Sequence, residues 1–250
     1  MVDPQTLSAD WAKLRHLGES LYDKKMFFNK KWCAYPKKDF NELFKNIAKG
    51  LDVRLNTTVK GVDLKTGKIT LDSQTEKADL IVSSLSLDKL FNYQFGKLGY
   101  RGYTIEPKII HKDSYHPQNP ETGNHYSMVY YPEDDVTHNR TTEYKWFNHK
   151  AKLPEYQGKT IITVETPNDR ARFYPFMNPE NEKRFTKYLK KASTFPKLLT
   201  IGRMGLYKYT TLDTTTAQAY RFITRANNWL DFSPAQRYTA YQAIRGNWKN

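Results

Sequence analysis

Residues 197–230 read KLLTIGRMGLYKYTTLDTTTAQAYRFITRANNWL, and this stretch indicates the class of the fold. Its apolar start predicts a short buried strand over Lys197–Gly202, which leads into a turn at Arg203–Tyr209. Apolar residues then recur at helical spacing and predict a helix over Thr214–Leu230. A strand, a turn and a helix in direct succession favour a fold that mixes α and β structure.

Helix and strand patterns also follow one another in the rest of the chain. Asp39 is a predicted helix N-cap with Glu42 three residues on, and Gly50 ends the helix. A basic amphipathic helix is expected over Pro179–Lys191. The expected strands include Lys68–Leu71, Ala78–Val82 and Thr160–Glu165. The sequence therefore predicts an α+β fold, with an antiparallel or mixed β-sheet and flanking helices.

Three parts are expected along the chain. Residues 1–35 are predicted to form a helical N-terminal arm and residues 36–230 an α+β domain. Residues 231–250, which interleave basic and aromatic side chains, are predicted to form a C-terminal helix or tail.

The chain is strongly basic. Its 40 Lys and Arg residues exceed its 26 Asp and Glu residues, which gives a formal net charge of +14 and a pI near 9.6. Such an excess favours polyanionic partners, either nucleic acid or an anionic membrane surface. The alternative is an enzyme that is basic without such a partner.

The remaining composition favours a cytoplasmic protein. The single cysteine, Cys33, excludes an intramolecular disulfide and fits a reducing compartment. No apolar run is long enough to cross a bilayer, and residues 1–10 lack the pattern of a secretory signal. We therefore expect a cytoplasmic location and no membrane attachment.

Several common catalytic motifs do not occur in the sequence. Neither G-x-G-x-x-G nor G-x-x-x-x-G-K-[ST] is present, and the G-x-S-x-G nucleophile motif is also absent. The six histidines lack the spacing of metal ligands, so no metal is expected. The acidic run Glu133–Asp135 follows Pro132 and is better explained as an exposed turn.

Four longer blocks are more specific. They are FNYQFGKL at 91–98 with Tyr100-Arg101, NRTTEYKWF at 139–147, FYP at 173–175 and GRMGLYKY at 202–209. In this order they resemble the F-x-Y-x-F-G-x-L-x-Y-R, T-R-x-x-E-x-K-x-F, Y-Y-P and G-R-L-x-x-Y-x-Y blocks of UDP-galactopyranose mutases. The resemblance covers roughly residues 10–225. It implies the fold of the substrate-handling part of that family, with residues 36–230 as a UDP-sugar-binding domain.

The resemblance also implies which residues hold the substrate. Members of the family grip the diphosphate of a UDP-sugar with arginines and tyrosines, which suits the planar guanidinium fork and the neutral phenol donor. Arg140 would be one phosphate clamp, with Tyr174 and Tyr209 as hydroxyl donors, and Arg15 a second clamp on a loop. Arg203 and Tyr207 are further candidates for substrate binding.

Structural roles remain open for each of these residues. Arg140 would serve equally in an ion pair of a strand surface, and Tyr174 and Tyr209 as core tyrosines. Arg15 has the alternative of a solvated helix face. Arg203 and Glu143 are also compatible with a buried structural pair.

The candidate catalytic residues are Arg140, which would stabilise charge on the leaving diphosphate, and the acids Asp213 and Glu143. The acid that the family places after its last tyrosine pair corresponds here to Thr211, and Asp213 lies two residues later. Glu165 is a further candidate by acid chemistry alone. The sequence does not choose among these three carboxylates as a general base.

The sequence departs from the family at the flavin. Members begin with a strand, a glycine-rich turn and a helix that cradle the FAD pyrophosphate, and this pattern is not seen here. Lys37 and Lys38 stand where the family has paired glycines after a proline. In the mutases the reduced flavin is the nucleophile, so FAD is not expected on this chain alone.

These observations lead to a main hypothesis and two alternatives. The main hypothesis is a flavin-independent glycosyltransferase that passes sugar from a UDP-sugar to a hydroxylated base in nucleic acid. The alternatives are the C-terminal part of an FAD-dependent mutase and a non-catalytic binding module. Nucleic-acid contacts are expected from Lys37, Lys38, Arg237, Arg245 and Lys249, although a closing helix would also explain the tail. The oligomeric state stays open.

Overall fold

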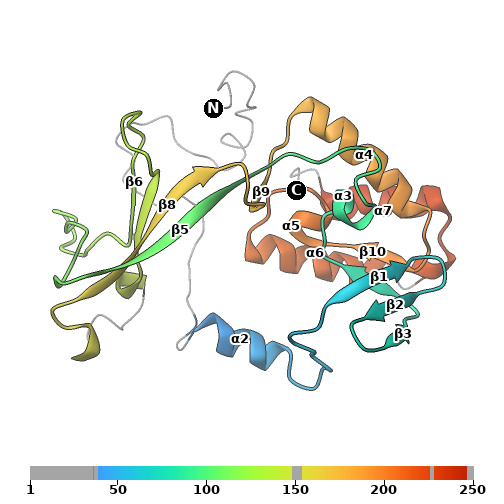
Figure 1. Cartoon of the computed structure of the whole chain (residues 1–250), viewed down its shortest axis with the longest axis horizontal. Helices are drawn as coiled ribbons and strands as arrows, with labels where there is room; N and C mark the ends of the chain where they lie inside the picture. Colours follow the sequence, from blue (N-terminus) through green and yellow to red (C-terminus); the bar gives the residue numbers. More distant parts are fainter. Residues whose placement is uncertain (1–35, 37–38, 148–153, 226–227, 247–250) are drawn as a thin grey trace. The chain divides into compact units, whose positions relative to one another are not determined.

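The structure is a computed structural model, and it describes residue 36 and residues 39–147, 154–225 and 228–246 (Figure 1). The chain divides into two compact units. Within the described residues, the first unit comprises 54–100 and 174–246, and the second comprises 36, 39–53 and 101–173. The expected arm over residues 1–35 lies outside the described residues, and the expected division at residues 35 and 230 stays a prediction.

The first unit contains two small sheets. One is antiparallel, with the order β1 (Val59–Asp63), β2 (Lys68–Leu71) and β3 (Thr75–Lys77). The other pairs β4 (Ile81–Ser83) with β10 (Leu198–Thr200) in parallel, and Ile81 lies opposite Leu198. The short strand β9 (Tyr174–Pro175) belongs to the same unit.

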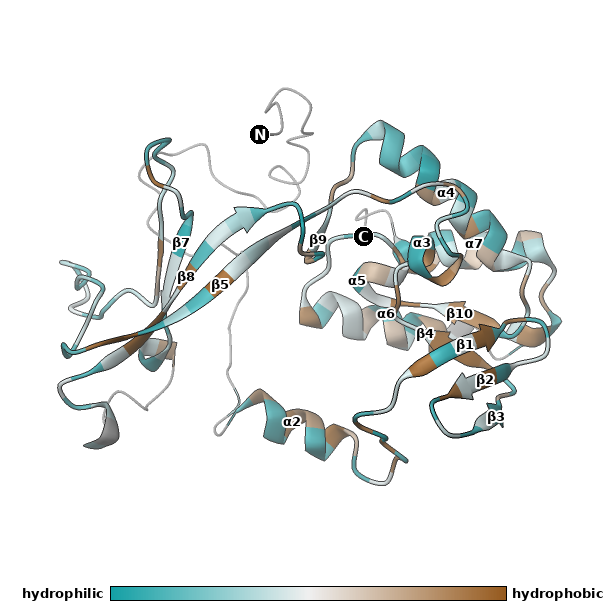
Figure 2. Ribbon diagram, in the orientation of Figure 1, coloured by the Kyte–Doolittle hydropathy of each residue, from teal (hydrophilic) through white to brown (hydrophobic). Residues whose placement is uncertain are grey.

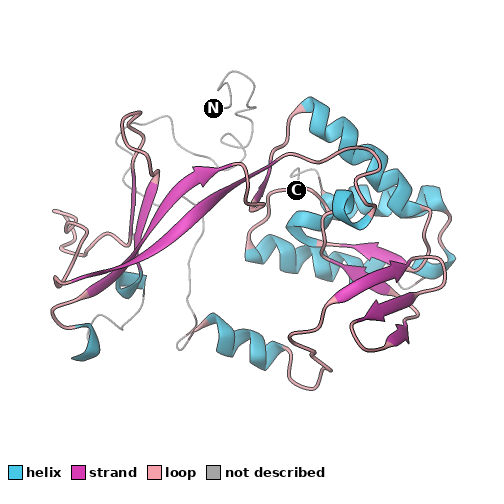
Figure 3. Cartoon of the chain, viewed as in Figure 1, coloured by secondary structure: helices cyan, strands magenta, loops and turns pink. Residues whose placement is uncertain are grey.

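Helices surround the parallel pair of the first unit (Figures 1 and 3). They are α3 (Leu87–Leu90), α4 (Pro179–Ser193), α5 (Gly202–Gly205), α6 (Leu212–Arg225) and α7 (Pro234–Arg245), with a 3-10 turn over Trp229–Asp231. Helix α4 forms where expected because Asn178 caps it and Pro179 fills its first turn. Helix α7 starts with a full capping box, made by Ser233 and Gln236.

The core of the first unit lies between these helices and β10. Leu198 and Leu199 of β10 are fully covered, as are Phe185, Tyr188 and Tyr241 from α4 and α7. The Tyr241 hydroxyl donates to the carbonyl of Leu198 at 2.9 Å, and the Trp229 indole N–H donates to the same oxygen at 3.1 Å. The C-terminal helix therefore belongs to the core.

The second unit is built on a long antiparallel sheet. Its strands lie in the order β6 (Met128–Tyr130), β7 (Arg140–Glu143), β8 (Thr160–Asn168) and β5 (Tyr100–Ile110). Strand β8 pairs along its whole length with β5, from Gly102 opposite Asn168 to Ile110 opposite Thr160. The 3-10 turns Tyr144–Phe147 and Pro154–Tyr156 lie between β7 and β8 in the sequence, and α2 (Phe40–Ile47) completes the unit.

The α+β class, with antiparallel and mixed strands beside helices, is confirmed. The expected helix over Thr214–Leu230 differs in its bounds, since α6 starts at Leu212 and a separate 3-10 turn begins at Trp229. The expected strand Ala78–Val82 is observed as Ile81–Ser83. Among the described residues, no helix has both the length and the apolar character needed to cross a bilayer.

Candidate functional site

Two tyrosines and an arginine of the first unit form one cluster. The rings of Tyr174 and Tyr209 stack with centroids 5.5 Å apart and an interplanar angle of 27°. The guanidinium carbon of Arg203 lies 5.0 Å from each ring centroid. The three residues come from β9, α5 and the segment before α6, so the fold joins two of the expected blocks at one place. A fixed cation beside two phenols is a suitable arrangement for an anion.

The backbone around α5 positions Arg203. Its Nε and Nη2 atoms donate to the carbonyl of Thr210 at 3.2 and 2.6 Å, which fixes the plane of the guanidinium. Gly205 lets α5 approach β10 closely, because a Cβ there would lie 2.4 Å from the Thr200 hydroxyl. Gly202, at the start of α5, has a φ of +80°, which favours glycine. The glycines of the GRMG block therefore serve this turn.

Asp213 lies at the start of α6, close in sequence to Thr210. The hydroxyl of Thr211 donates to the carboxylate of Asp213, and the backbone N–H of Thr211 donates to the Thr214 hydroxyl at 2.8 Å. Thr211 is the residue that the resemblance aligns with the acid of the family. Its hydroxyl is bonded to the Asp213 carboxylate. Asp213 is exposed and in the first helical turn, where a negative charge is stabilised.

Tyr207 is placed differently from the expectation that it contacts substrate. Its side chain is fully buried, and its hydroxyl donates to the carbonyls of Gly99 and Phe176 at 2.6 and 2.8 Å. Its ring stacks on Phe185 at 5.5 Å. Burial raises the pKa of this phenol well above its usual range. These contacts assign Tyr207 to the core.

Arg140 belongs to the second unit and forms a two-point ion pair with Glu165. Its Nε and Nη2 atoms donate to the two carboxylate oxygens at 2.9 and 2.5 Å. Its Nη1 donates to the Tyr130 hydroxyl at 3.3 Å. Burial works against its charge, but the hydrogen bonds to Glu165 and Tyr130 outweigh this and raise the pKa of Arg140. Arg140 is thus a permanent cation held in one orientation, with 26% of its side chain exposed.

Glu143 anchors a loop of the second unit. The carboxylate is fully buried and accepts from the backbone N–H of His116 at 2.8 Å and from that of Tyr115 at 3.1 Å. The hydroxyl of Ser114 donates to it at 3.3 Å. These hydrogen bonds from Ser114, Tyr115 and His116 to the Glu143 carboxylate hold the loop in place. These surroundings give the proposed catalytic role of Glu143 no support. The alternative of a buried pair with Arg203 stays a prediction, because the two residues belong to different units.

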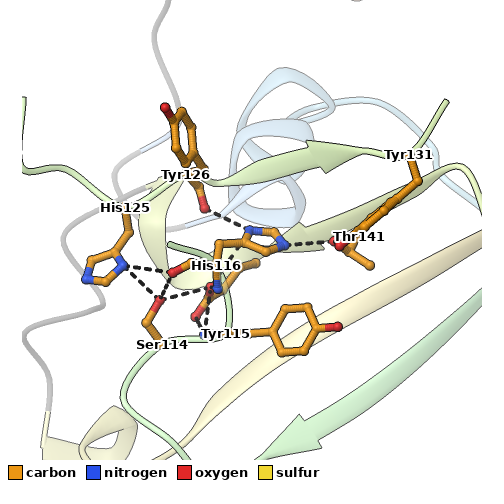
Figure 4. Close-up of polar contacts among 8 residues, drawn as sticks. Ser114, Tyr115, His116, His125, Tyr126, Tyr131 and Thr141 are labelled. Atoms are coloured by element: carbon orange, nitrogen blue, oxygen red, sulfur yellow. Dashed lines mark hydrogen bonds and ion pairs between the residues drawn. The ribbon is translucent and has the colours of Figure 1, made fainter. Parts of the chain in front are cut away.

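The same loop carries a polar network that the sequence analysis did not anticipate (Figure 4). The Nδ1–H of His116 donates to the Tyr126 carbonyl at 2.8 Å, and its Nε2 lies 2.8 Å from the Thr141 hydroxyl. The Ser114 hydroxyl lies 2.9 Å from Nδ1 of His125. The hydrogen-bond partners of His116 lie 10 and 25 residues further along the chain, so no local sequence pattern indicates this network.

The expected nucleic-acid contacts of the tail are also placed differently. Arg237 is buried, and it donates to the carbonyls of Ser193 and Phe232. Arg245 forms a two-point ion pair with Glu182 at 2.9 and 2.7 Å. Both arginines therefore fix α7 to the rest of the first unit. The other candidate positions, Arg15, Lys37, Lys38 and Lys249, lie outside the described residues.

The described residues do not fit the pyrophosphate of a flavin. Such a cradle needs a strand, a glycine-rich turn and a helix with free N–H groups. The connection from β4 to α3 consists of Ser84, Leu85 and Ser86. After β10, Gly205 is packed against Thr200, and α5 is a single short turn. Neither connection offers the cradle.

The chain was compared with known proteins. The family described as UDP-galactopyranose mutase matches residues 2–209. The UDP-galactopyranose mutase of Mycoplasma genitalium is 29% identical in an alignment of 183 residues that covers 69% of this chain and 42% of that protein. A probable UDP-galactopyranose mutase of Klebsiella pneumoniae is 25% identical over 252 residues, covering 88% of this chain and 61% of that protein. The dTDP-fucopyranose mutase of Escherichia coli is 23% identical, with 79% and 49% covered.

A solved structure of a UDP-galactopyranose mutase has a similar fold. A crystal structure of reduced UDP-galactopyranose mutase superimposes with a TM-score of 0.60 over 83% of this chain and 57% of that one, at 13% identity. This likeness shows the fold. The chain belongs to the UDP-galactopyranose mutase family, and it spans about half the length of the curated relatives it matches.

Proposed function

We propose that this chain binds a UDP-sugar as the substrate-handling part of a sugar mutase, with Tyr174, Arg203 and Tyr209 at the diphosphate. The observation that carries the proposal is the packing of one guanidinium 5.0 Å from two stacked tyrosine rings. Two of these residues, Tyr174 and Tyr209, are those to which the family motifs assign hydroxyl donors. The relatives reported above act on UDP-galactopyranose and dTDP-fucopyranose by name, which supports a nucleoside diphosphate sugar as the ligand.

The chemistry of the cluster suits a diphosphate. A guanidinium is charged at all physiological pH values and donates to phosphate oxygens from a rigid plane. Thr210 holds that plane in the observed structure. Phenol hydroxyls beside the cation would add neutral donors, and their rings would cover one side of the ligand from water. Arg140 is held by Glu165 within the second unit, and its role as a phosphate clamp stays a prediction from the family motif.

A sugar mutase is a better candidate than a glycosyltransferase for the activity of the protein to which this chain contributes. The relatives reported above are all mutases, and no observation in the structure favours transfer to an acceptor. The cluster of Tyr174, Arg203 and Tyr209 contains no carboxylate of its own. The carboxylate nearest to Tyr209 in sequence is that of Asp213. Transfer to nucleic acid therefore has no support from the site.

We also propose that this chain alone does not hold FAD, because the connections after β4 and β10 lack a glycine-rich cradle. The purified chain should be colourless, and added FAD should keep the absorbance spectrum of free flavin. A yellow complex with one flavin per chain would contradict this part of the proposal without affecting the diphosphate site.

A comparison of nucleotides tests the binding proposal. Titration calorimetry of the purified chain with UDP, UMP and uridine should give affinity in that order, because each phosphate adds charge-assisted hydrogen bonds worth about 1.5–3 kcal/mol each. Equal affinity for UDP and uridine would show that the diphosphate is not recognised and would contradict the proposal.

A further inference from the structure

The outer face of α4 carries three lysines in a row, namely Lys183, Lys187 and Lys190, which we call the α4 lysine face. All three are exposed. Their spacing of four and three residues places them on one side of the helix, about 6 and 4.5 Å apart along its axis. Figure 2 shows the hydrophilic character of this helix. The row is therefore a continuous strip of positive charge.

The acids of α4 are engaged elsewhere. Glu180 pairs with Arg184 at 2.6 Å, and Glu182 pairs with Arg245 of α7 at 2.7 Å. Within the described part of the chain, the lysines at 183, 187 and 190 form no ion pair. Arginines thus take up the carboxylates of the helix, and the lysine charges face solvent uncompensated.

The surroundings extend the positive strip. Arg184 donates to the carbonyl of Lys97 at 2.8 Å, which brings the exposed lysine at 97 beside α4. Lys190 lies 6.0 Å from the ring of Tyr238 on α7. The exposed residues of α7 beside it, such as Gln236 and Thr239, are uncharged, so no acid from that helix opposes the strip.

We propose that the α4 lysine face binds the phosphate backbone of a nucleic acid, without reading its bases. A row of lysines supplies point charges to phosphates and no flat surface for base recognition. This proposal moves the polyanion contact from the tail arginines, which the structure uses internally, to a helix whose charges are uncompensated. It does not depend on the diphosphate site.

A membrane surface fits the same face less well. A helix that lies on a bilayer inserts an apolar face between the lipids. The apolar face of α4, formed by Phe185, Tyr188, Leu189 and Ala192, is buried in the core of the first unit. Only charge attraction to an anionic surface would then remain, without the apolar insertion that such helices use.

The test uses the full chain and a short fluorescein-labelled DNA duplex. Anisotropy should show binding at low salt, with a log-log salt slope that contains about −2.7 from the three lysines, or about a 40-fold loss of affinity between 50 and 200 mM salt. Replacing the three lysines by glutamine should remove that part of the slope. Glutamine has a helix propensity close to that of lysine, so α4 should remain folded. The variant differs from the parent by three positive charges.

A matched variant separates the face from total charge. Lys68 and Lys77 lie exposed on β2 and β3, and Lys65 lies exposed in the turn between β1 and β2. Replacing all three by glutamine removes the same charge. This control should bind within about threefold of the parent, because it leaves the three lysines of the α4 lysine face in place. Equal weakening in both variants would contradict the proposal. So would the absence of DNA binding at 50 mM salt, including the case in which vesicles containing phosphatidylserine are bound instead.

Discussion

Arg140 of β7 and Glu165 of β8 lie directly opposite each other in the antiparallel sheet and are joined by two hydrogen bonds, at 2.9 and 2.5 Å. The carboxylate is almost fully buried, with 4% of the Glu165 side chain exposed. It also accepts from the Thr142 hydroxyl at 3.3 Å. The pair therefore fixes the direction of the Arg140 guanidinium.

Replacing Glu165→Ala should destabilise the protein by about 2–4 kcal/mol, because it leaves the Arg140 charge half-buried without its partner. The midpoint of urea unfolding measures this change. Glu180→Ala is the control, since it breaks an exposed pair with Arg184 in the other unit, and should cost less than about 0.5 kcal/mol. Similar losses in the two variants would show that the buried pair contributes no more than an exposed one.

Tyr209→Phe should weaken UDP binding by about 3- to 10-fold while the melting temperature stays within a few degrees. The change removes the hydroxyl and keeps the ring that stacks on Tyr174. Calorimetry with UDP and a thermal melt measure the two effects on the same sample.

Tyr207→Phe is expected to show the reverse behaviour. It leaves the carbonyls of Gly99 and Phe176 without their buried donor, which should cost about 1–3 kcal/mol of stability. UDP affinity should be unchanged at a temperature where the variant is folded. If Tyr207→Phe lost UDP binding and Tyr209→Phe kept it, the assignment of the two tyrosines would be reversed.

Local patterns predicted much of the fold. Asp39 caps α2 through its bond to the Glu42 N–H at 2.7 Å, and Asn178 caps α4 in the same way. Such caps and the apolar spacing are short-range signals, so they are visible in sequence. The sequence left a closing helix open as an explanation of the tail, and α7 begins there with a capping box at Ser233.

The site was only partly predictable because its contacts are long-range. Tyr207 and Tyr209 are two residues apart in one motif, yet one is in the core and the other in the cluster. Tyr207 has a left-handed φ of 45°, which turns the chain before Tyr209. No residue pattern in the sequence predicts this conformation. The burial of Arg237 likewise depends on carbonyls of Ser193 and Phe232 that tertiary packing brings to it.

Glu143→Gln should lower stability by about 1–3 kcal/mol and leave UDP affinity unchanged. The amide would present N–H groups toward the N–H donors of Tyr115 and His116, which now bond to the carboxylate. Urea unfolding measures the loss, and hydrogen exchange of the His116 amide locates it in the loop. A large fall in UDP affinity at unchanged stability would instead favour a role for Glu143 at the substrate.

Stability should rise with pH above about 8 through Lys208. Burial, then repulsion from Arg245, lowers the pKa of Lys208 from 10.5 to about 8. Above pH 8 the unfolded chain keeps this proton longer than the folded chain, so raising the pH favours the folded state. The window closes near pH 10, where buried tyrosines such as Tyr241, whose pKa is raised by burial, begin to act in the opposite direction.

Comparison with Lys208→Met isolates this contribution. Between pH 8 and pH 10 the parent should gain about 1–2 kcal/mol relative to the variant, because solvent still screens a half-buried ammonium. Urea midpoints at several pH values give the difference. Parallel pH profiles for the two proteins would show that Lys208 titrates in the folded state as it does in the unfolded chain.

The most direct test of the diphosphate site is the UDP affinity of Arg203→Gln. Titration calorimetry should show at least a tenfold weaker complex than the parent, because the cation beside Tyr174 and Tyr209 is lost. Arg184→Gln removes an equal charge from a half-buried position on α4, outside this cluster, and should bind UDP as the parent does. Unchanged UDP affinity in folded Arg203→Gln would contradict the assignment of this cluster to the diphosphate.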